Sequence, residues 1–179
     1  GLEVLVAARA RGLRTVMEQT IAPMEVEMKL LRQEHDRFPG WESAQSTGPA
    51  IDEYIARERA EWAQSDLILC GSEFVREGIA ACGGPVERCK VVPYGVDSNF
   101  GCIERKQHAG PLRVLTVGAI GLRKGSPYVL EVAKALGGQA KFRMVGSHPI
   151  GPQSRQALEA VLELTGVVPR SEIQQHFAW

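Results

Sequence analysis

The sequence predicts an α/β protein that contains parts of two doubly wound parallel-sheet domains. Short hydrophobic segments typical of buried strands alternate with helical segments, and this alternation occurs in residues 1–98 and starts afresh in residues 112–179. Between them, residues 99–111 have no sustained hydrophobic periodicity, which is typical of a linker between domains. Alternating strands and helices favour parallel sheets, because a crossover helix returns each strand to run in the same direction.

In the first half, each element follows from hydrophobic spacing and from the residues that end it. A glycine closes the first helix, proline and glycine end the second at Phe38–Gly40, and a third has alanines on one face and charges on the other. Ser72 is a candidate N-cap for the fourth helix. The expected helices are 2–12, 23–38, 51–63 and 73–81, and the expected strands are 13–17, 66–70 and 90–93.

The second half repeats this order of elements. The first helix there has Val129, Val132 and Leu136 on one face, and two glycines close it at 137–138. Ser171 and Gln174 have the spacing of a capping box that would open the last helix. The expected strands are 112–117, 141–145 and 161–165, and the expected helices are 126–136, 153–160 and one from 171 onward.

Composition excludes several classes of protein. The chain has 179 residues, with 21 Lys and Arg against 21 Asp and Glu. A formal net charge of zero argues against a protein that binds nucleic acid or coats an anionic membrane. No apolar stretch approaches the ~18 residues that a membrane span requires. We therefore expect no nucleic-acid partner and at most peripheral membrane contact.

Cysteine usage predicts the compartment. The four cysteines have no Cys-x-x-Cys pair and no histidine spacing that would complete a zinc site. We interpret them as free thiols of a cytoplasmic protein, which could lie at the inner face of the membrane.

The two ends of the sequence predict an internal fragment. Residue 1 is glycine and not an initiator methionine, and no glycine, proline or basic turn closes the last helix before Trp179. We expect the chain to be roughly the middle of one about twice as long.

The segment from Val117 to Pro127 carries the clearest chemistry. A predicted strand leads into a glycine-bearing loop with two adjacent cations, Arg123 and Lys124, and a helix then begins with Ser126 as its cap. Unsatisfied N–H groups and the positive end of the helix dipole would point toward these cations, which favours a phosphate site. A tight turn with two solvated cations is an equally simple interpretation.

Two other phosphate-binding loops fit less well. A Walker-type loop needs Gly-Lys-Ser/Thr, whereas the order here is Lys124-Gly125-Ser126. A dinucleotide-binding domain needs an acidic residue at the end of the next strand, and that strand ends at residues 144–147 without one.

Four segments together resemble a known family. They are Gly71-Ser72-Glu73-Phe74-Val75, Val91-Val92-Pro93-Tyr94-Gly95-Val96-Asp97, Val117-Gly118 through Lys124-Gly125, and Leu164-Thr165-Gly166-Val167-Val168-Pro169. In this order and spacing they resemble the retaining GT-B glycosyltransferases of family 4, the group 1 glycosyl transferases.

The resemblance implies two Rossmann-like domains that face a cleft. Residues 1–98 would be the C-terminal part of the acceptor domain, 99–111 the interdomain linker, and 112–179 the truncated N-terminal part of the donor domain. Lys124 would contact the donor's diphosphate beside Gly118 and Gly125. The family often has an arginine after the loop's first glycine, where this chain has Ala119, so Arg123 is the candidate substitute.

The resemblance also implies which residues lie near the donor sugar and base. Gly95 would let the backbone turn close to the sugar, Gly146 would lie at a strand end near the donor, and the Gly166–Arg170 loop, with Val168, would approach the nucleobase. A plain strand-to-helix turn explains that last loop equally well. The segment Glu18-Gln19-Thr20-Ile21-Ala22-Pro23 corresponds to the place near the acceptor where many members have a histidine. This chain has none there, and a polar strand end that faces solvent is the simpler expectation. The family's paired glutamates would lie beyond Trp179, so the catalytic residues are unknown.

The function expected is hexose transfer from a nucleotide-diphosphate sugar to an acceptor hydroxyl, with retention and without a bound metal or cofactor. The acceptor would be a glycan, a lipid-linked glycan or a small molecule, and the chain alone would be inactive. Two alternatives stay open. One is a non-catalytic nucleotide-binding α/β module, and the other is a Rossmann-type epimerase or dehydrogenase.

Overall fold

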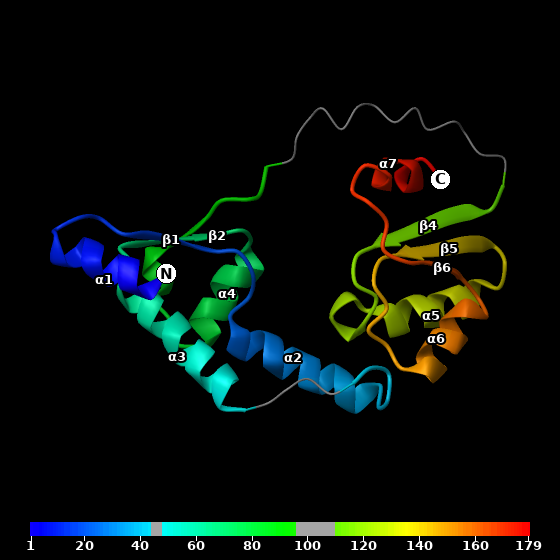
Figure 1. Ribbon diagram of the computed structural model, residues 1–179, viewed down its shortest axis with the longest axis horizontal. Coiled ribbons are helices and arrows are strands. Elements are labelled where there is room, and N and C mark those ends of the chain that lie inside the picture. The colour runs from blue at the N-terminus through cyan, green and yellow to red at the C-terminus, as the bar shows by residue number, and fades with distance from the viewer. Residues whose placement is uncertain (44–47, 96–109) are drawn as a thin grey trace. The chain divides into compact units, whose positions relative to one another are not determined.

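The computed structural model describes residues 1–43, 48–95 and 110–179 and shows the predicted α/β architecture (Figure 1). The chain forms two compact units. Unit 1 comprises Gly1–Leu30 and Ser46–Val96, and unit 2 comprises Leu31–Gln45 and Asp97–Trp179. The assignment of residues 1–98 to an acceptor domain and of residues 112–179 to a donor domain stays a prediction. The predicted linker lies outside the described residues except at positions 110 and 111, as does Cys102.

Unit 1 contains a parallel sheet with the strand order β1-β2-β3. Val16 of β1 pairs with Leu67 of β2, and Ile68 of β2 pairs with Cys89 of β3. A buried cluster that includes Trp62, Ile68 and Ile79 holds the helices to the sheet. The elements are α1 (Leu2–Ala10), β1 (Val16–Gln19), α3 (Pro49–Ala63), β2 (Leu67–Cys70), α4 (Glu73–Ala81), η1 (Val86–Arg88) and β3 (Cys89–Val91).

Unit 2 contains a second parallel sheet, with the order β4-β5-β6. Val117 of β4 pairs with Val145 of β5, which pairs with Thr165 of β6. Helices α5 and α6 cover one face of this sheet, and α7 lies on the other side (Figure 1). The elements are β4 (Leu112–Val117), η2 (Leu122–Lys124), α5 (Ser126–Leu136), β5 (Ala140–Val145), α6 (Pro152–Glu159), β6 (Glu163–Thr165) and α7 (Ile173–Phe177).

One helix contributes to both units. Helix α2 (Met24–Arg37) belongs to unit 1 as far as Leu30 and to unit 2 from Leu31 onward. Leu31 and Trp41, which follows the helix, are buried in the core of unit 2 beside Ile120 and Leu122. Sequence periodicity predicts the helix but not this division between two cores.

Three local predictions need correction. Gly125, with φ +66°, is the N-cap of α5, so Ser126 is the first helical residue and its hydroxyl accepts a hydrogen bond from Trp41. The capping box at Ser171 does not form, because a turn from Pro169 leads into α7 and Glu172 is its N-cap without a side-chain bond. Strand β1 begins at Val16 and not at residue 13.

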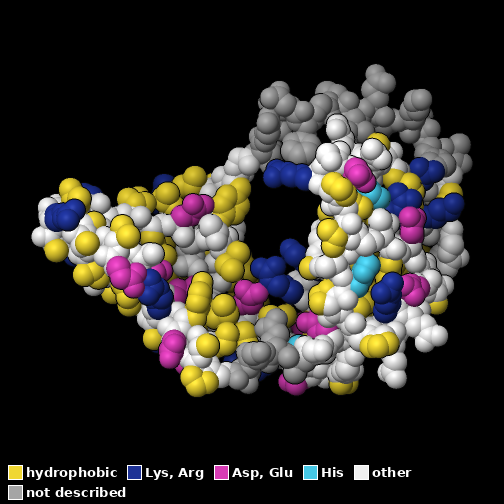
Figure 2. Space-filling view, in the orientation of Figure 1, with side chains coloured by type: hydrophobic (Ala, Val, Ile, Leu, Met, Phe, Trp, Pro, Cys, Tyr) yellow, Lys and Arg dark blue, Asp and Glu magenta, His cyan; other side chains and the backbone are white. Residues whose placement is uncertain are grey.

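Other cap predictions are confirmed. The Ser72 hydroxyl accepts a hydrogen bond from the Val75 N–H, and Gly137 closes α5 with φ +48°. On the face shown in Figure 2, basic and acidic side chains are interspersed over each unit, as the balanced charge leads one to expect. Among the helices of the described residues, none has the length and apolar character needed to cross a bilayer.

Candidate functional site

The second sheet brings the predicted donor-site segments to one edge. Strands β4, β5 and β6 are parallel, so the residues that follow them emerge at the same edge of the sheet. Gly118 follows β4, Gly146 follows β5, and Gly166 follows β6. In open α/β sheets, ligands bind outside this carboxyl edge. The topology therefore places all three predicted loops at the edge where open α/β sheets bind ligands.

Gly118 and Gly146 lie in close backbone contact at this edge. The Gly118 N–H donates to Val145 O (2.9 Å), and the Ile120 N–H donates to Ser147 O (2.8 Å). Gly146 has φ +151°, and a β-carbon on it would overlap the carbonyl oxygen of Gly118. Glycine is required at this position for both reasons. Gly146 therefore lies against the backbone at the start of the basic loop, and its predicted place near the donor stays a prediction.

The two cations lie on the short turn η2. Arg123 and Lys124 are both exposed, and a β-carbon placed on Gly118 would lie 3.9 Å from Lys124 Cε. Lys124 therefore extends along the backbone of the glycine that follows β4. Gly125 then turns the chain through the left-handed region into α5. This arrangement brings the four residues predicted for the diphosphate, Gly118, Arg123, Lys124 and Gly125, into one loop.

The expectation of unsatisfied N–H groups at this helix start is wrong for most positions. The Leu122 N–H donates to Glu42 Oε2 (2.8 Å). Three further N–H groups donate to the carbonyl oxygens of Gly121 and Leu122 in the same loop. The N–H groups that are already bonded are those of Leu122, Lys124, Gly125 and Ser126. Pro127 has no N–H to offer. The side chains of the loop therefore carry most of its capacity to bind an anion.

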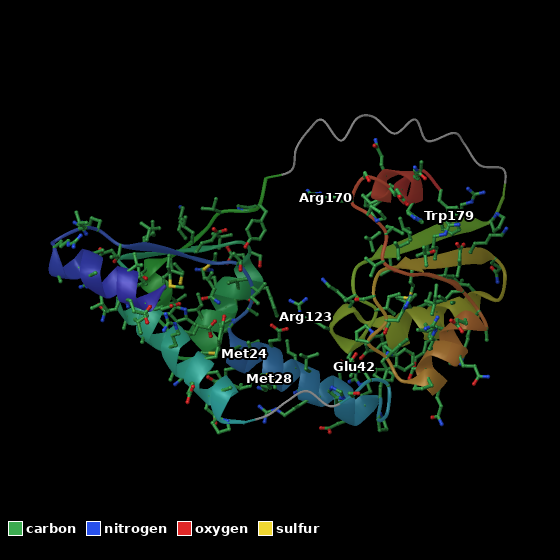
Figure 3. All side chains as sticks on the ribbon, in the orientation of Figure 1. Met24, Met28, Glu42, Arg123, Arg170 and Trp179 are labelled. Atoms are coloured by element: carbon green, nitrogen blue, oxygen red, sulfur yellow. The ribbon has the colours of Figure 1, made fainter. Side chains whose placement is uncertain are left out.

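The loop after β6 holds the other predicted donor residues. Val168 is partly buried and Arg170 is exposed, and the Glu172 N–H donates to Pro169 O (2.9 Å). Figure 3 shows Arg123 and Arg170 extending from the same side of unit 2. Beyond this loop, the guanidinium of Arg143 lies 4.0 Å from the centre of the Trp179 ring, which anchors the chain after α7. The roles of Val168 and Arg170 stay predictions.

Gly95 lies in unit 1, beyond the carboxyl end of β3. The residue before it, Tyr94, donates its hydroxyl hydrogen to Thr20 O (2.8 Å), and its ring lies against Gly71, where a β-carbon would overlap it. Tyr94 thus links the segments that follow all three strands of this sheet and fixes the backbone beside Gly95. The predicted role of Gly95 near the sugar is untested.

The polar end of β1 faces solvent only in part: Glu18 and Thr20 are exposed as expected, whereas the Gln19 side chain is buried. Gln19 is buried, donates to Glu58 Oε1 (2.9 Å) and accepts from the Trp62 indole N–H (3.0 Å). Burial is the main cause that raises the pKa of Glu58. A pocket of about 220 Å³ adjoins this cluster, lined by residues 17–21 and by Tyr54, Arg57, Glu58 and Glu61.

Sequence reasoning missed the contribution of the segment after α2. Trp41 and Glu42 fall between the predicted helices 23–38 and 51–63, and their hydrogen-bond partners, Ser126 and Leu122, lie 85 and 80 residues further on. A tryptophan directly after a Pro-Gly break was the one available signal, because large aromatic side chains are seldom left in solvent. No cluster of three or more metal-ligating side chains occurs among the described residues.

No protein-family model and no curated protein matches the sequence. Solved structures do match. HepE (Alr3699) of Anabaena in complex with UDP matches with a TM-score of 0.59, at 16% identity, over 99% of this chain and 48% of that chain. The fold is that of GT-B glycosyltransferases. The HepE complexes with UDP-glucose and with UDP and glucose each match with a TM-score of 0.56, at 15% and 17% identity.

The lipopolysaccharide outer core galactosyltransferase WaaB, in its apo form, matches at 19% identity with a TM-score of 0.48, over 73% of this chain and 37% of that chain. The chain spans about half the length of the HepE structures. At these identities the likeness establishes the GT-B fold alone.

Proposed function

We propose that this chain is part of a glycosyltransferase that moves a hexose from a nucleotide-diphosphate sugar to an acceptor hydroxyl, with retention of configuration. The observation that carries the proposal is the basic turn of Arg123 and Lys124 beside Gly118, at the carboxyl edge of a parallel sheet. The GT-B fold supports it, because matching HepE structures contain UDP or UDP-glucose.

Lys124 has the main chemical role in this proposal. As the glycosidic bond breaks, negative charge develops on the diphosphate leaving group, and a fixed cation lowers the energy of that state. Most N–H groups of the loop already bond within the protein, so Lys124 and Arg123 supply this charge instead of the helix start. No bound metal is then required, and metal independence is part of the proposal.

The other predicted residues take positions around the donor. Gly146 lets the backbone approach the donor without a side chain in the way, while Val168 and Arg170 border the nucleobase. Gly95, held by Tyr94, borders the sugar from unit 1. Unit 1 would bind the acceptor, which would be a glycan, a lipid-linked glycan or a small molecule. We propose a cytoplasmic location, with at most peripheral contact with the membrane.

The test is donor binding and turnover by the intact protein that carries this sequence. Calorimetry with UDP, GDP and ADP and their sugars identifies the base. Lys124→Ala should then cost about 2–4 kcal/mol of transition-state stabilisation, or roughly 30- to 1000-fold in kcat/KM. Lys134→Ala, on the exposed face of α5, is the matched control and should leave kcat/KM unchanged. Turnover by Lys124→Ala at the wild-type rate would remove the assignment.

Two further measurements test the finer parts of the proposal. Proton NMR of the first product formed reports its anomeric configuration, and an inverted product would contradict retention. Full activity in excess EDTA is expected, and a loss that Mg²⁺ restores would contradict metal independence. Tight nucleotide binding without transfer to any acceptor would favour a non-catalytic nucleotide-binding module.

A further inference from the structure

The end of α2 and the residues that follow it, 31–43, form part of the donor-side core in unit 2. Leu31 and Trp41 are buried there with Ile120, Leu122 and Leu130. The Gly151 N–H donates to Trp41 O (2.8 Å), so the segment is also tied to the start of α6. On its outer side, the Tyr128 hydroxyl donates to Glu34 Oε2 (2.7 Å). Residues 31–43 are thus a fixed part of unit 2 and lie directly behind η2.

Glu42 supports the first residue of the cation-bearing turn. Its Oε2 accepts the Leu122 N–H (2.8 Å), and its side chain is only 12% exposed. A β-carbon on Gly121 would lie 2.5 Å from the same oxygen, so glycine makes room for the carboxylate. His35 Nε2 lies 3.8 Å from Oε1. Figure 3 shows Glu42 beside the turn and Arg123 extending outward from it.

Trp41 supports the other end of the turn. Its indole N–H donates to the Ser126 hydroxyl (2.9 Å), and both side chains are buried. Ser126 is the first residue of α5. The turn that carries Arg123 and Lys124 is therefore held at Leu122 by Glu42 and at Ser126 by Trp41, two neighbouring residues of one segment. A loop held at both ends needs little reorganisation when an anion binds.

The carboxylate and the cations occupy different sides of the turn. Glu42 lies against Gly121, which is buried, whereas Lys124 is exposed and extends beside Gly118. An incoming diphosphate would meet Lys124 and not Glu42. A hydrogen bond from a backbone N–H to a carboxylate is among the stronger ones in proteins, so its loss should loosen the turn.

We propose that Glu42 is a positioning residue of the donor site, whose carboxylate fixes the turn that presents Arg123 and Lys124 to the donor's diphosphate. This inference rests on the proposed function. It assigns a role in donor binding to a residue that precedes the donor sheet by about 70 positions. The alternative is that Glu42 competes with the diphosphate for the turn, in which case its removal would tighten binding.

Three substitutions separate the hydrogen bond from the charge. Glu42→Ala removes both. Glu42→Asp keeps the charge but withdraws the carboxylate by one methylene, out of reach of the Leu122 N–H. Glu42→Gln keeps an oxygen at the same reach and loses the charge. Glu34→Ala is the matched control, because it removes a different hydrogen bond between the same segment and α5.

The first measurement is calorimetry with UDP, GDP and ADP on the intact protein. For the nucleotide that binds wild type, we expect Glu42→Ala and Glu42→Asp to bind about tenfold more weakly. Glu42→Gln and Glu34→Ala should stay within about threefold of wild type. The same pattern is expected in the KM for the donor, with the KM for the acceptor unchanged. Unchanged or tighter binding by Glu42→Ala overturns the inference while the proposed function stands.

A second measurement needs no donor. Amide hydrogen exchange at Leu122 should be faster in Glu42→Ala and Glu42→Asp and protected in Glu42→Gln. Leu122 exchange as slow as wild type in Glu42→Ala overturns the support role of Glu42. If wild-type protein binds none of the three nucleotides, the proposed function fails and the donor role of Glu42 fails with it. Should Glu42→Ala not fold, the contrast between Glu42→Asp and Glu42→Gln decides the question.

Discussion

Three glycines of unit 2 allow the cost of the Gly118–Gly146 contact to be measured in isolation. Gly166 has no positive φ, and a β-carbon on it would meet no atom within 4 Å. Gly138 has φ +88° and is equally open, whereas Gly146 has φ +151° and faces the carbonyl oxygen of Gly118. Alanine at Gly166 therefore adds no backbone strain, and alanine at Gly138 adds backbone strain alone. Alanine at Gly146 adds backbone strain and a steric clash.

The expected costs follow from these environments. Gly166→Ala should change stability by about 0.5 kcal/mol or less. Gly138→Ala should cost about 1–2 kcal/mol, the usual penalty for a left-handed L-residue. Gly146→Ala should cost about 1–3 kcal/mol in backbone strain and about 1–3 kcal/mol more in overpacking, because backbone atoms cannot rotate away.

The assay is hydrogen exchange of peptides from β4 and β5 followed by mass spectrometry. It reports the stability of unit 2 by itself, which a single unfolding curve of a two-unit chain does not. Nucleotide binding should fall with Gly146→Ala, since the clash displaces Gly118 from beside Lys124. If the β4 amides exchange as slowly in Gly146→Ala as in Gly138→Ala, the close contact between Gly118 and Gly146 is wrong.

Three other predictions concern buried polar groups. Ser126→Ala leaves the Trp41 indole N–H buried without an acceptor and should lower the unfolding free energy of unit 2 by about 1–3 kcal/mol; the added change Trp41→Phe should restore part of that loss in the same exchange assay. Burial raises the pKa of Glu58, so the folded state holds that proton more tightly than the unfolded state. The stability this supplies is complete below the ordinary glutamate pKa and is lost as pH rises through the raised value. The unfolding free energy of unit 1, measured by hydrogen exchange of α3 peptides between pH 4 and 7, should therefore fall more steeply with pH in wild type than in Glu58→Gln. Burial raises the pKa of Cys82 as well as that of Cys70, the latter to about 11, and Cys82 is the more accessible thiol. Iodoacetamide at pH 8 should therefore alkylate Cys82 well before Cys70, and equal rates in peptide mass maps would contradict this.

Hydrophobic spacing was sufficient to predict most helices and strands, and parallel pairing then places the donor loops together. Helix α4, for example, runs over Glu73–Ala81, as its spacing and the Ser72 cap predict. The start of β1 was misplaced, because its buried end is polar. Gln19 is buried through partners on α3, Glu58 and Trp62, and no pattern within the strand itself encodes them.

The support behind the basic loop could not be predicted for a related reason. Glu42 and Trp41 follow a Pro-Gly break and belong to no periodic segment, and their partners lie 80 and 85 residues away. Local spacing carries no information about such contacts. Likewise, the sequence predicts a helix start at Ser126 but cannot show that the N–H groups around it are already bonded within the protein.

The division of α2 between the two units has a consequence for protein engineering. A shortened chain that begins just before the second sheet, at residue 110, would lack Leu31 and Trp41 and would leave a gap in the core around Ile120 and Leu122. An exchange of the second half between proteins of this fold would meet the same difficulty. A chimaera joined near the middle of the chain would separate the basic loop from the residues that hold it. Residues 31–43 must therefore be exchanged together with the second half of the chain.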